Sequence, residues 1–125
     1  MQVSDEAGTF ERIFPGGYAP AACPSRTVLE HVTSKWGVLI LVALVDGTLR
    51  WSELRRRVQG VSEKMLAQTL QTLEADGLVR REAHPVIPPH VDYSLTSLGS
   101  DLVKRLLPLL EWIVEHAEGI TGRAQ

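Results

Sequence analysis

The sequence has 125 residues, which is enough for one domain with a hydrophobic core and leaves little room for a second. Hydrophobic residues make up 44% and charged residues 22%, so neither a disordered nor a membrane-embedded chain is indicated. The net charge of −2 excludes a chain that is basic throughout, so any nucleic-acid interface has to come from local charge.

A single cysteine, Cys23, argues against a secreted scaffold held by disulfides, because one thiol cannot close a bridge within its own chain. The N-terminal stretch MQVSDEAGTFERIF is acidic and lacks the apolar run of a signal peptide. The longest apolar run, Val38–Val45, is too short to span a bilayer. We therefore expect a cytoplasmic protein with no membrane partner.

The N-terminal third predicts an arm followed by two helices. Glycines and prolines interrupt residues 1–22, which should form a partly irregular arm. SRTVLEHVTSKW (25–36) has the spacing of one apolar helix face, with Ser25 as its N-cap. GVLILVALVDG (37–47) is apolar all round, which predicts a fully buried central helix ending at Gly47.

The middle of the chain predicts a short edge strand (48–51) and two short helices joined by a tight turn. SELRRRV (52–58) predicts a helix capped by Ser52 and broken at Gln59-Gly60. SEKMLAQTLQTLEADG predicts a second helix, capped by Ser62 and closed by a glycine. Its buried stripe should consist of Leu66, Leu70 and Leu73.

LVRREAH (78–84) and VDYSLT (91–96) alternate as two strands. The segment between them contains Pro85, Pro88 and Pro89, which cannot donate backbone hydrogen bonds, so it should form a stiff tip outside the sheet. A long helix should follow, at about 97–118, with a wide apolar surface and an interruption at Pro108, where we expect a kink.

Two helices around a tight turn, followed by a two-stranded ribbon, indicate a winged helix-turn-helix. The fold class is therefore mainly α with a small β-ribbon, and residues 23–125 form one domain ending in a long C-terminal dimerisation helix. Residues 49–84 carry seven basic and five acidic side chains, a net +2 that leaves −4 for the remainder. This local charge favours contact with phosphates, although a merely solvated helix face would also carry charged residues.

On the second of these helices, a spacing of about 100° per residue directs polar side chains outward, where they could bind base edges in the major groove of double-stranded DNA. The candidate DNA-binding residues are Arg55, Arg56, Ser62, Lys64, Met65, Gln68, Thr69, Gln71, Thr72, Arg80, Arg81 and His90.

The sequence resembles the HxlR-type winged-helix regulators, relatives of the MarR regulators, over residues 23–118. The matching motifs are Cys23-Pro24, Lys35-Trp36, RWSEL, LEADGLVRR, PP-x-V-x-Y-x-LT and a terminal helix with a tryptophan. The resemblance implies a homodimeric bacterial transcription regulator that binds pseudo-palindromic DNA. His90 stands where family members often have an arginine, and Thr33-Ser34 replace a common Gly-Gly.

Cys23 is a candidate sensor, since it comes just before a predicted helix, where backbone N–H groups favour a thiolate. The resemblance implies that a cysteine at this place can respond to oxidants or electrophiles. The alternative is an inert cysteine buried at the dimer seam. The predicted dimer interface comprises Phe14, Val28, Leu106, Leu110, Ile113 and Val114.

We find no pattern of catalytic nucleophile and base, no phosphate loop and no paired carboxylates, so we expect no enzyme and no cofactor. The four histidines are scattered in the sequence, which predicts no metal site. Two alternatives to a redox-responsive DNA-binding regulator stay open. One is a winged-helix module that binds protein, and the other is a regulator switched by a small molecule at the dimer seam.

Overall fold

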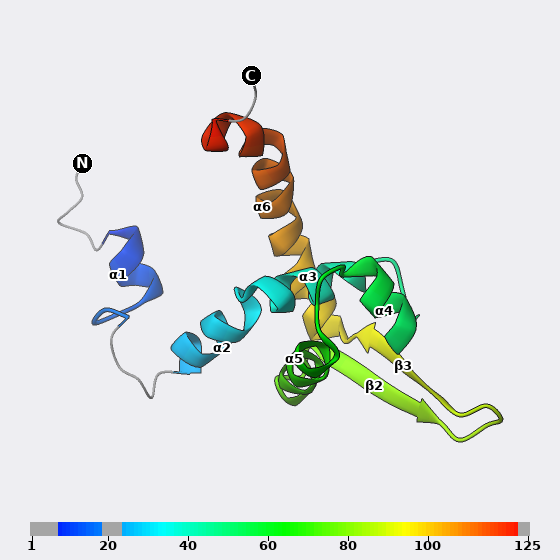
Figure 1. Cartoon of the computed structure of the whole chain (residues 1–125). Coiled ribbons are helices and arrows are strands. Elements are labelled where there is room, and N and C mark those ends of the chain that lie inside the picture. Colours follow the sequence, from blue (N-terminus) through cyan, green and yellow to red (C-terminus); the bar gives the residue numbers. More distant parts are fainter. Residues whose placement is uncertain (1–7, 19–23, 123–125) are drawn as a thin grey trace.

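The computed structural model describes residues 8–18 and 24–122, and Figure 1 shows their arrangement. The elements, in chain order, are α1 (Thr9–Ile13), α2 (Pro24–Val32), α3 (Lys35–Ala43), β1 (Leu49–Arg50), α4 (Trp51–Arg57), α5 (Glu63–Ala75), β2 (Val79–His84), β3 (His90–Leu95) and α6 (Ser97–Thr121). The predicted fold class, mainly α with a small β-ribbon and a long C-terminal helix, is confirmed.

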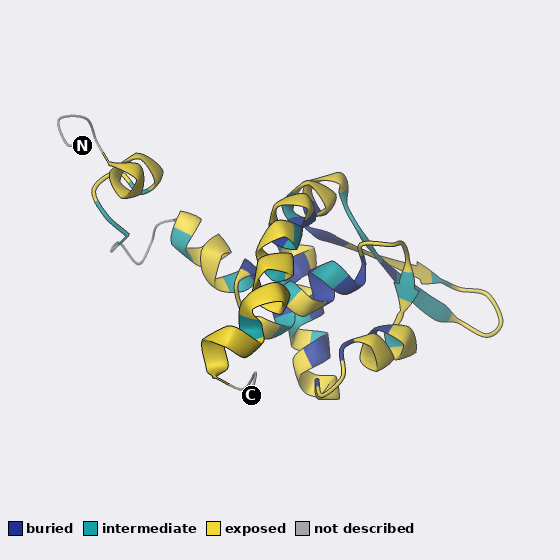
Figure 2. Ribbon diagram, turned by 90° about the horizontal axis from the view of Figure 1, so that it is seen from above, coloured by how far each residue is buried: buried dark blue, intermediate teal, exposed yellow. Residues whose placement is uncertain are grey.

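The core is built around α3, which contacts α2, α4, α5 and α6. Ile40 and Leu41 are completely buried, and Leu44 is 1% exposed. α3 ends at Ala43 and not at Gly47 as predicted. The prediction that residues 37–47 are buried all round is wrong at Leu39 and at Val45, which are 39% and 41% exposed. Figure 2 shows the buried residues gathered in the body of the molecule, with α1 and the far end of α6 exposed.

The boundary between the first two predicted helices lies earlier in the chain than the sequence indicated. Ser25 lies inside α2 and is not its N-cap, because the helix already includes Pro24, whose missing N–H costs nothing in a first turn. The chain then breaks at Ser34, which is extended and whose Oγ accepts a hydrogen bond from the Gly37 N–H at 3.1 Å. Within the predicted irregular arm, residues 9–13 form the short helix α1.

The sheet is antiparallel, with the strand order β1-β3-β2. The β2–β3 register runs from Val79↔Leu95 to His84↔His90, and Tyr93 at the centre of β3 is 8% exposed. The proline segment lies between the two strands, as predicted. The β2–β3 ribbon projects from the body as a wing beside α5 (Figure 1).

Helix α6 begins after Thr96, whose Oγ1 accepts a hydrogen bond from the Gly99 N–H at 2.9 Å and donates one to the Gly77 carbonyl at 2.7 Å. The helix runs through Pro108 without a break and ends at Thr121, so the proline does not divide it, and the kink expected there stays a prediction. Among the described residues, no helix is long and apolar enough to cross a membrane.

Two glycines of α6 provide a matched test of its packing. A Cβ at Gly99 would overlap the carbonyl oxygen of Leu78, whereas a Cβ at Gly119 would meet no atom within 4 Å. We expect Gly99→Ala to lower the free energy of unfolding by about 1–3 kcal/mol. Gly119→Ala should raise it by about 0.5–1 kcal/mol, because alanine favours the helix. Urea denaturation measures both, and a Gly99→Ala variant as stable as the wild type would contradict this packing.

Candidate nucleic-acid interface

Helices α4 and α5 are joined by a turn that requires a glycine. Gly60 has φ +95°, a conformation that side chains with a Cβ rarely adopt. Val58 and Val61, on either side of the turn, are buried at 4% exposure each and anchor it to the core. This helix–turn–helix unit is followed by the β2–β3 wing, as the sequence predicted.

Helix α5 has an apolar and a polar face. Leu66 and Leu73 are completely buried and Leu70 is 3% exposed, which confirms the predicted stripe. Residues four and seven positions apart share a helix face, so Lys64, Gln68 and Gln71 lie together on the opposite side, and all three are exposed. The outward face thus carries one ammonium group and two amides.

The flank of α5 next to α2 is less open. Met65 is 38% exposed, while Thr69 and Thr72 are half-buried. These side chains line a pocket with His31 and Ser34. The Thr72 hydroxyl donates a hydrogen bond to the Gln68 carbonyl at 3.1 Å. The Thr72 oxygen can therefore still accept a hydrogen bond from a ligand.

The N-terminus of α5 is capped as predicted, since Ser62 Oγ accepts a hydrogen bond from the Met65 N–H at 3.1 Å. The predicted cap of α4 is wrong. Ser52 lies inside α4, because β1 leads directly into the helix and leaves Arg50 as the extended N-cap residue. The Glu53 carboxylate accepts the Arg50 N–H at 2.8 Å, which satisfies a backbone donor at this end.

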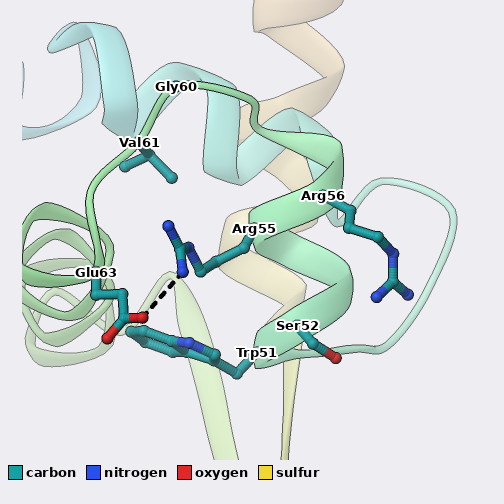
Figure 3. Close-up of a pocket in the computed structure, with 7 residues that line it drawn as sticks. All are labelled: Trp51, Ser52, Arg55, Arg56, Gly60, Val61 and Glu63. Carbon is teal, nitrogen blue, oxygen red and sulfur yellow. Dashed lines mark hydrogen bonds and ion pairs between the residues drawn. The ribbon is translucent and has the colours of Figure 1, made fainter.

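Figure 3 shows how the basic residues of α4 divide between two sides. Arg55 and Arg56 line one pocket with Trp51, Ser52, Gly60, Val61 and Glu63. Arg55 points toward the turn, where its Nη1 lies 3.0 Å from Glu63 Oε2, while Arg56 leaves the other side of α4 and points away from Glu63. Glu63 is exposed over 73% of its side chain. Arg55 is therefore partly neutralised, and Arg56 is the more available cation.

The wing carries Arg80 and Arg81, which are both exposed. Successive side chains of a strand point to opposite faces, so the two guanidinium groups leave the ribbon on different sides. Arg80 pairs with Glu82 at 3.4 Å. The predicted contact residue His90 is half-buried at the base of the proline tip, and its ring stacks on His84.

The structure brings together three side chains that the sequence analysis had left apart. His84 and His90 face each other across the ribbon, and Asp92 lies close to both, so one ligand atom from each residue lies within 4.8 Å of the others. The prediction that the histidines are scattered is wrong for His84 and His90. The sequence did contain a signal for this contact, because the residues that flank a proline tip lie opposite each other when the two strands form an antiparallel ribbon.

The residues predicted for the dimer interface differ in their exposure to solvent. Leu106 is 9% exposed and belongs to the core of the chain, so the expectation that it lies on an outer face is wrong. Ile113 and Val114 are 43% and 79% exposed, whereas Leu110 is half-buried. Phe14 and Val28 line an apolar groove between α1 and α2. Cys23 lies outside the described residues.

The family model described as HxlR-like helix-turn-helix matches residues 31–121. The chain belongs to this family. The HTH-type transcriptional regulator YtfH of Escherichia coli K12 is 57% identical over 103 residues, which cover 82% of each chain. The HxlR-like chain is therefore a transcriptional regulator of the helix-turn-helix type and not an enzyme.

Solved structures agree with this assignment. The solved structure of the transcriptional regulator YtfH from Salmonella typhimurium is 56% identical in sequence and superimposes with a TM-score of 0.77. The match covers 83% of the present chain and 93% of the Salmonella protein. The redox regulator HypR in its oxidised form is 36% identical with a TM-score of 0.69, covering 74% and 96%. Both likenesses support the winged helix-turn-helix fold.

Proposed function

We propose that this protein binds pseudo-palindromic operator DNA as a homodimer, with α5 in the major groove and the β2–β3 wing alongside. The observation that carries the proposal is the outward face of α5. Burial of the leucine stripe leaves Lys64, Gln68 and Gln71 exposed together, and amide groups in this position can pair with base edges. The protein would bind this DNA in the cytoplasm.

The other candidate residues have complementary roles in this proposal. Arg56 on α4 and the two wing arginines supply phosphate contacts, which position the protein without reading sequence. Ser62 and the N-terminus of α5 present backbone N–H groups that favour an anion. A winged helix that binds protein instead would need an apolar outward face on α5, and this face is polar and basic.

The first prediction concerns α5. Gln68→Ala and Gln71→Ala should each lower discrimination at one base pair by about 1–3 kcal/mol, because an amide that pairs with a base edge is lost. Lys64→Ala should weaken binding to all sequences and reduce the salt slope by about 1 if the lysine contacts phosphate. Fluorescence anisotropy on sites selected from random duplexes measures both effects.

Lys104→Ala is the matched control, since Lys104 is an exposed lysine on α6 and its loss changes the net charge equally. It should leave the operator affinity nearly unchanged. Wild-type affinity in the triple variant Lys64→Ala, Gln68→Ala, Gln71→Ala would refute the role of α5.

The second prediction concerns the homodimer. The exposed Ile113 and Val114 on α6 favour a self-association surface, because a monomer would leave this apolar area in water. Light scattering at micromolar concentration should find a dimer for the wild type and a monomer for the double variant Ile113→Glu, Val114→Glu.

The wing tip offers a control of the same chemistry. Val86 and Ile87 are 52% and 98% exposed, and the double variant Val86→Glu, Ile87→Glu should stay dimeric. A monomeric wild type, or a dimer that tolerates both charges on α6, would exclude this surface.

The third prediction concerns Cys23, the only thiol of the sequence. Similarity to a protein named a redox regulator supports a response to oxidants in this chain as well. Diamide would withdraw two electrons and two protons from the Cys23 thiols of the two subunits, which join as a disulfide. The altered angle between subunits should lower operator affinity about tenfold, a coupling of ~1.4 kcal/mol.

The test compares operator affinity before and after diamide in the wild type and in Cys23→Ser, with reversal by a reducing thiol. A loss confined to the wild type supports the proposal. An equal response of both proteins would exclude Cys23 as the sensor. No response in either would favour a ligand in the apolar groove lined by Phe14 and Val28, or constitutive binding.

A further inference from the structure

The base of the wing holds two imidazoles and one carboxylate in close contact. The antiparallel register sets His84 opposite His90, and Asp92 shares a strand face with His90 because the two are two residues apart. The imidazole rings stack with centroids 4.8 Å apart and an interplanar angle of 28°. Asp92 Oδ2 lies 2.9 Å from His84 Nε2, and Asp92 Oδ1 lies 3.9 Å from His90 Nε2.

We propose that His84, His90 and Asp92 bind a divalent transition-metal ion of the Zn²⁺ type. Two imidazole nitrogens and a carboxylate oxygen form a ligand set that suits zinc, with water in the fourth position. Metal–ligand bonds of about 2.0–2.1 Å in a tetrahedral site place the ligand atoms ~3.3 Å apart. The two Asp92 oxygens lie 2.9 and 3.9 Å from the imidazole nitrogens, on either side of this value. One ligand atom from each of the three residues lies within 4.8 Å of the others, so side-chain rotation would have to bring them closer around one ion.

The surroundings of the His84 Nε2 atom favour a bound ion at this site. Its Nε2 is inaccessible to solvent, and no described group makes a well-aligned hydrogen bond with it, although Asp92 Oδ2 is near. A metal ion would accept the lone pair of this nitrogen and would be a partner for both the imidazole and the Asp92 carboxylate.

The surrounding charges are compatible with a cation. Arg50 Nε lies 3.9 Å from Asp92 Oδ1 and competes for this carboxylate, but its side chain is 55% exposed and can turn into water. Glu82 lies opposite Asp92 and adds negative charge on the same face, balanced in part by its contact with Arg80. With neutral imidazoles, the three proposed ligands carry one negative charge.

A bound ion would connect the two strands at the root of the proline tip and replace this negative charge with a positive one. If the wing contacts DNA, the metal should strengthen that contact, a consequence that rests on the proposed function. Metal binding itself involves no DNA and can be measured without it, so failure of one claim is distinguishable from failure of the other.

Isothermal titration of the full-length protein with ZnCl₂ at neutral pH tests the site. The wild type should bind one Zn²⁺ per chain, and His84→Ala and His90→Ala should each weaken binding at least tenfold. His116→Ala removes an exposed histidine of α6 that stacks on Trp112, and it should bind Zn²⁺ as the wild type does. Cys23→Ser should also bind Zn²⁺ with wild-type affinity, which separates this site from zinc binding by the thiol. The wild type should not bind Mg²⁺.

A second measurement needs no variant and therefore does not depend on how the substitutions affect folding. Nitrogen NMR of the imidazoles in the wild type should show Zn²⁺-dependent shifts for His84 and His90, and none for His31 and His116. Failure of the wild type to bind Zn²⁺ would overturn the proposal. So would unchanged affinity in the His84→Ala, His90→Ala double variant, or equal shifts of all four histidines.

Discussion

Burial of α3 is the interaction on which the other elements depend. Four helices contact it, and the side chains of Ile40, Leu41 and the C-cap residue Leu44 are almost completely removed from water. Burying one such side chain contributes about 1.5–3 kcal/mol. An exposed ion pair such as Arg55–Glu63 contributes ~0–1 kcal/mol by comparison. The orientation of α5 therefore follows from the core and not from surface charge.

The same burial creates both candidate sites. Because the leucine stripe of α5 faces α3, the helical spacing leaves Lys64, Gln68 and Gln71 on the outer side. In the wing, burial of Tyr93 determines which face of β3 packs on the body, and strand alternation then assigns Asp92 to the other face. Residues that take no part in the core are thus positioned by residues that do.

The sequence was informative where a repeating pattern or a local rule decides the structure. The α5 stripe, the Ser62 cap and the proline tip follow from periodicity, capping and the missing proline N–H. The errors have other causes. Ser25 and Ser52 were equally good caps by residue type, but Pro24 and β1 set where their helices begin. Leu106 could not be separated from Ile113, because only tertiary packing decides which apolar residues of a long helix the core covers.

Major-groove reading by two copies of α5 is the central claim, and methylation interference tests it most directly. A methyl group on guanine N7 projects into the major groove and blocks readout there. Two interfering tracts about one helical turn apart, ~34 Å or a small multiple, are predicted for a two-fold dimer. Specific binding with no interference from N7 methylation anywhere in a guanine-containing operator would contradict the account.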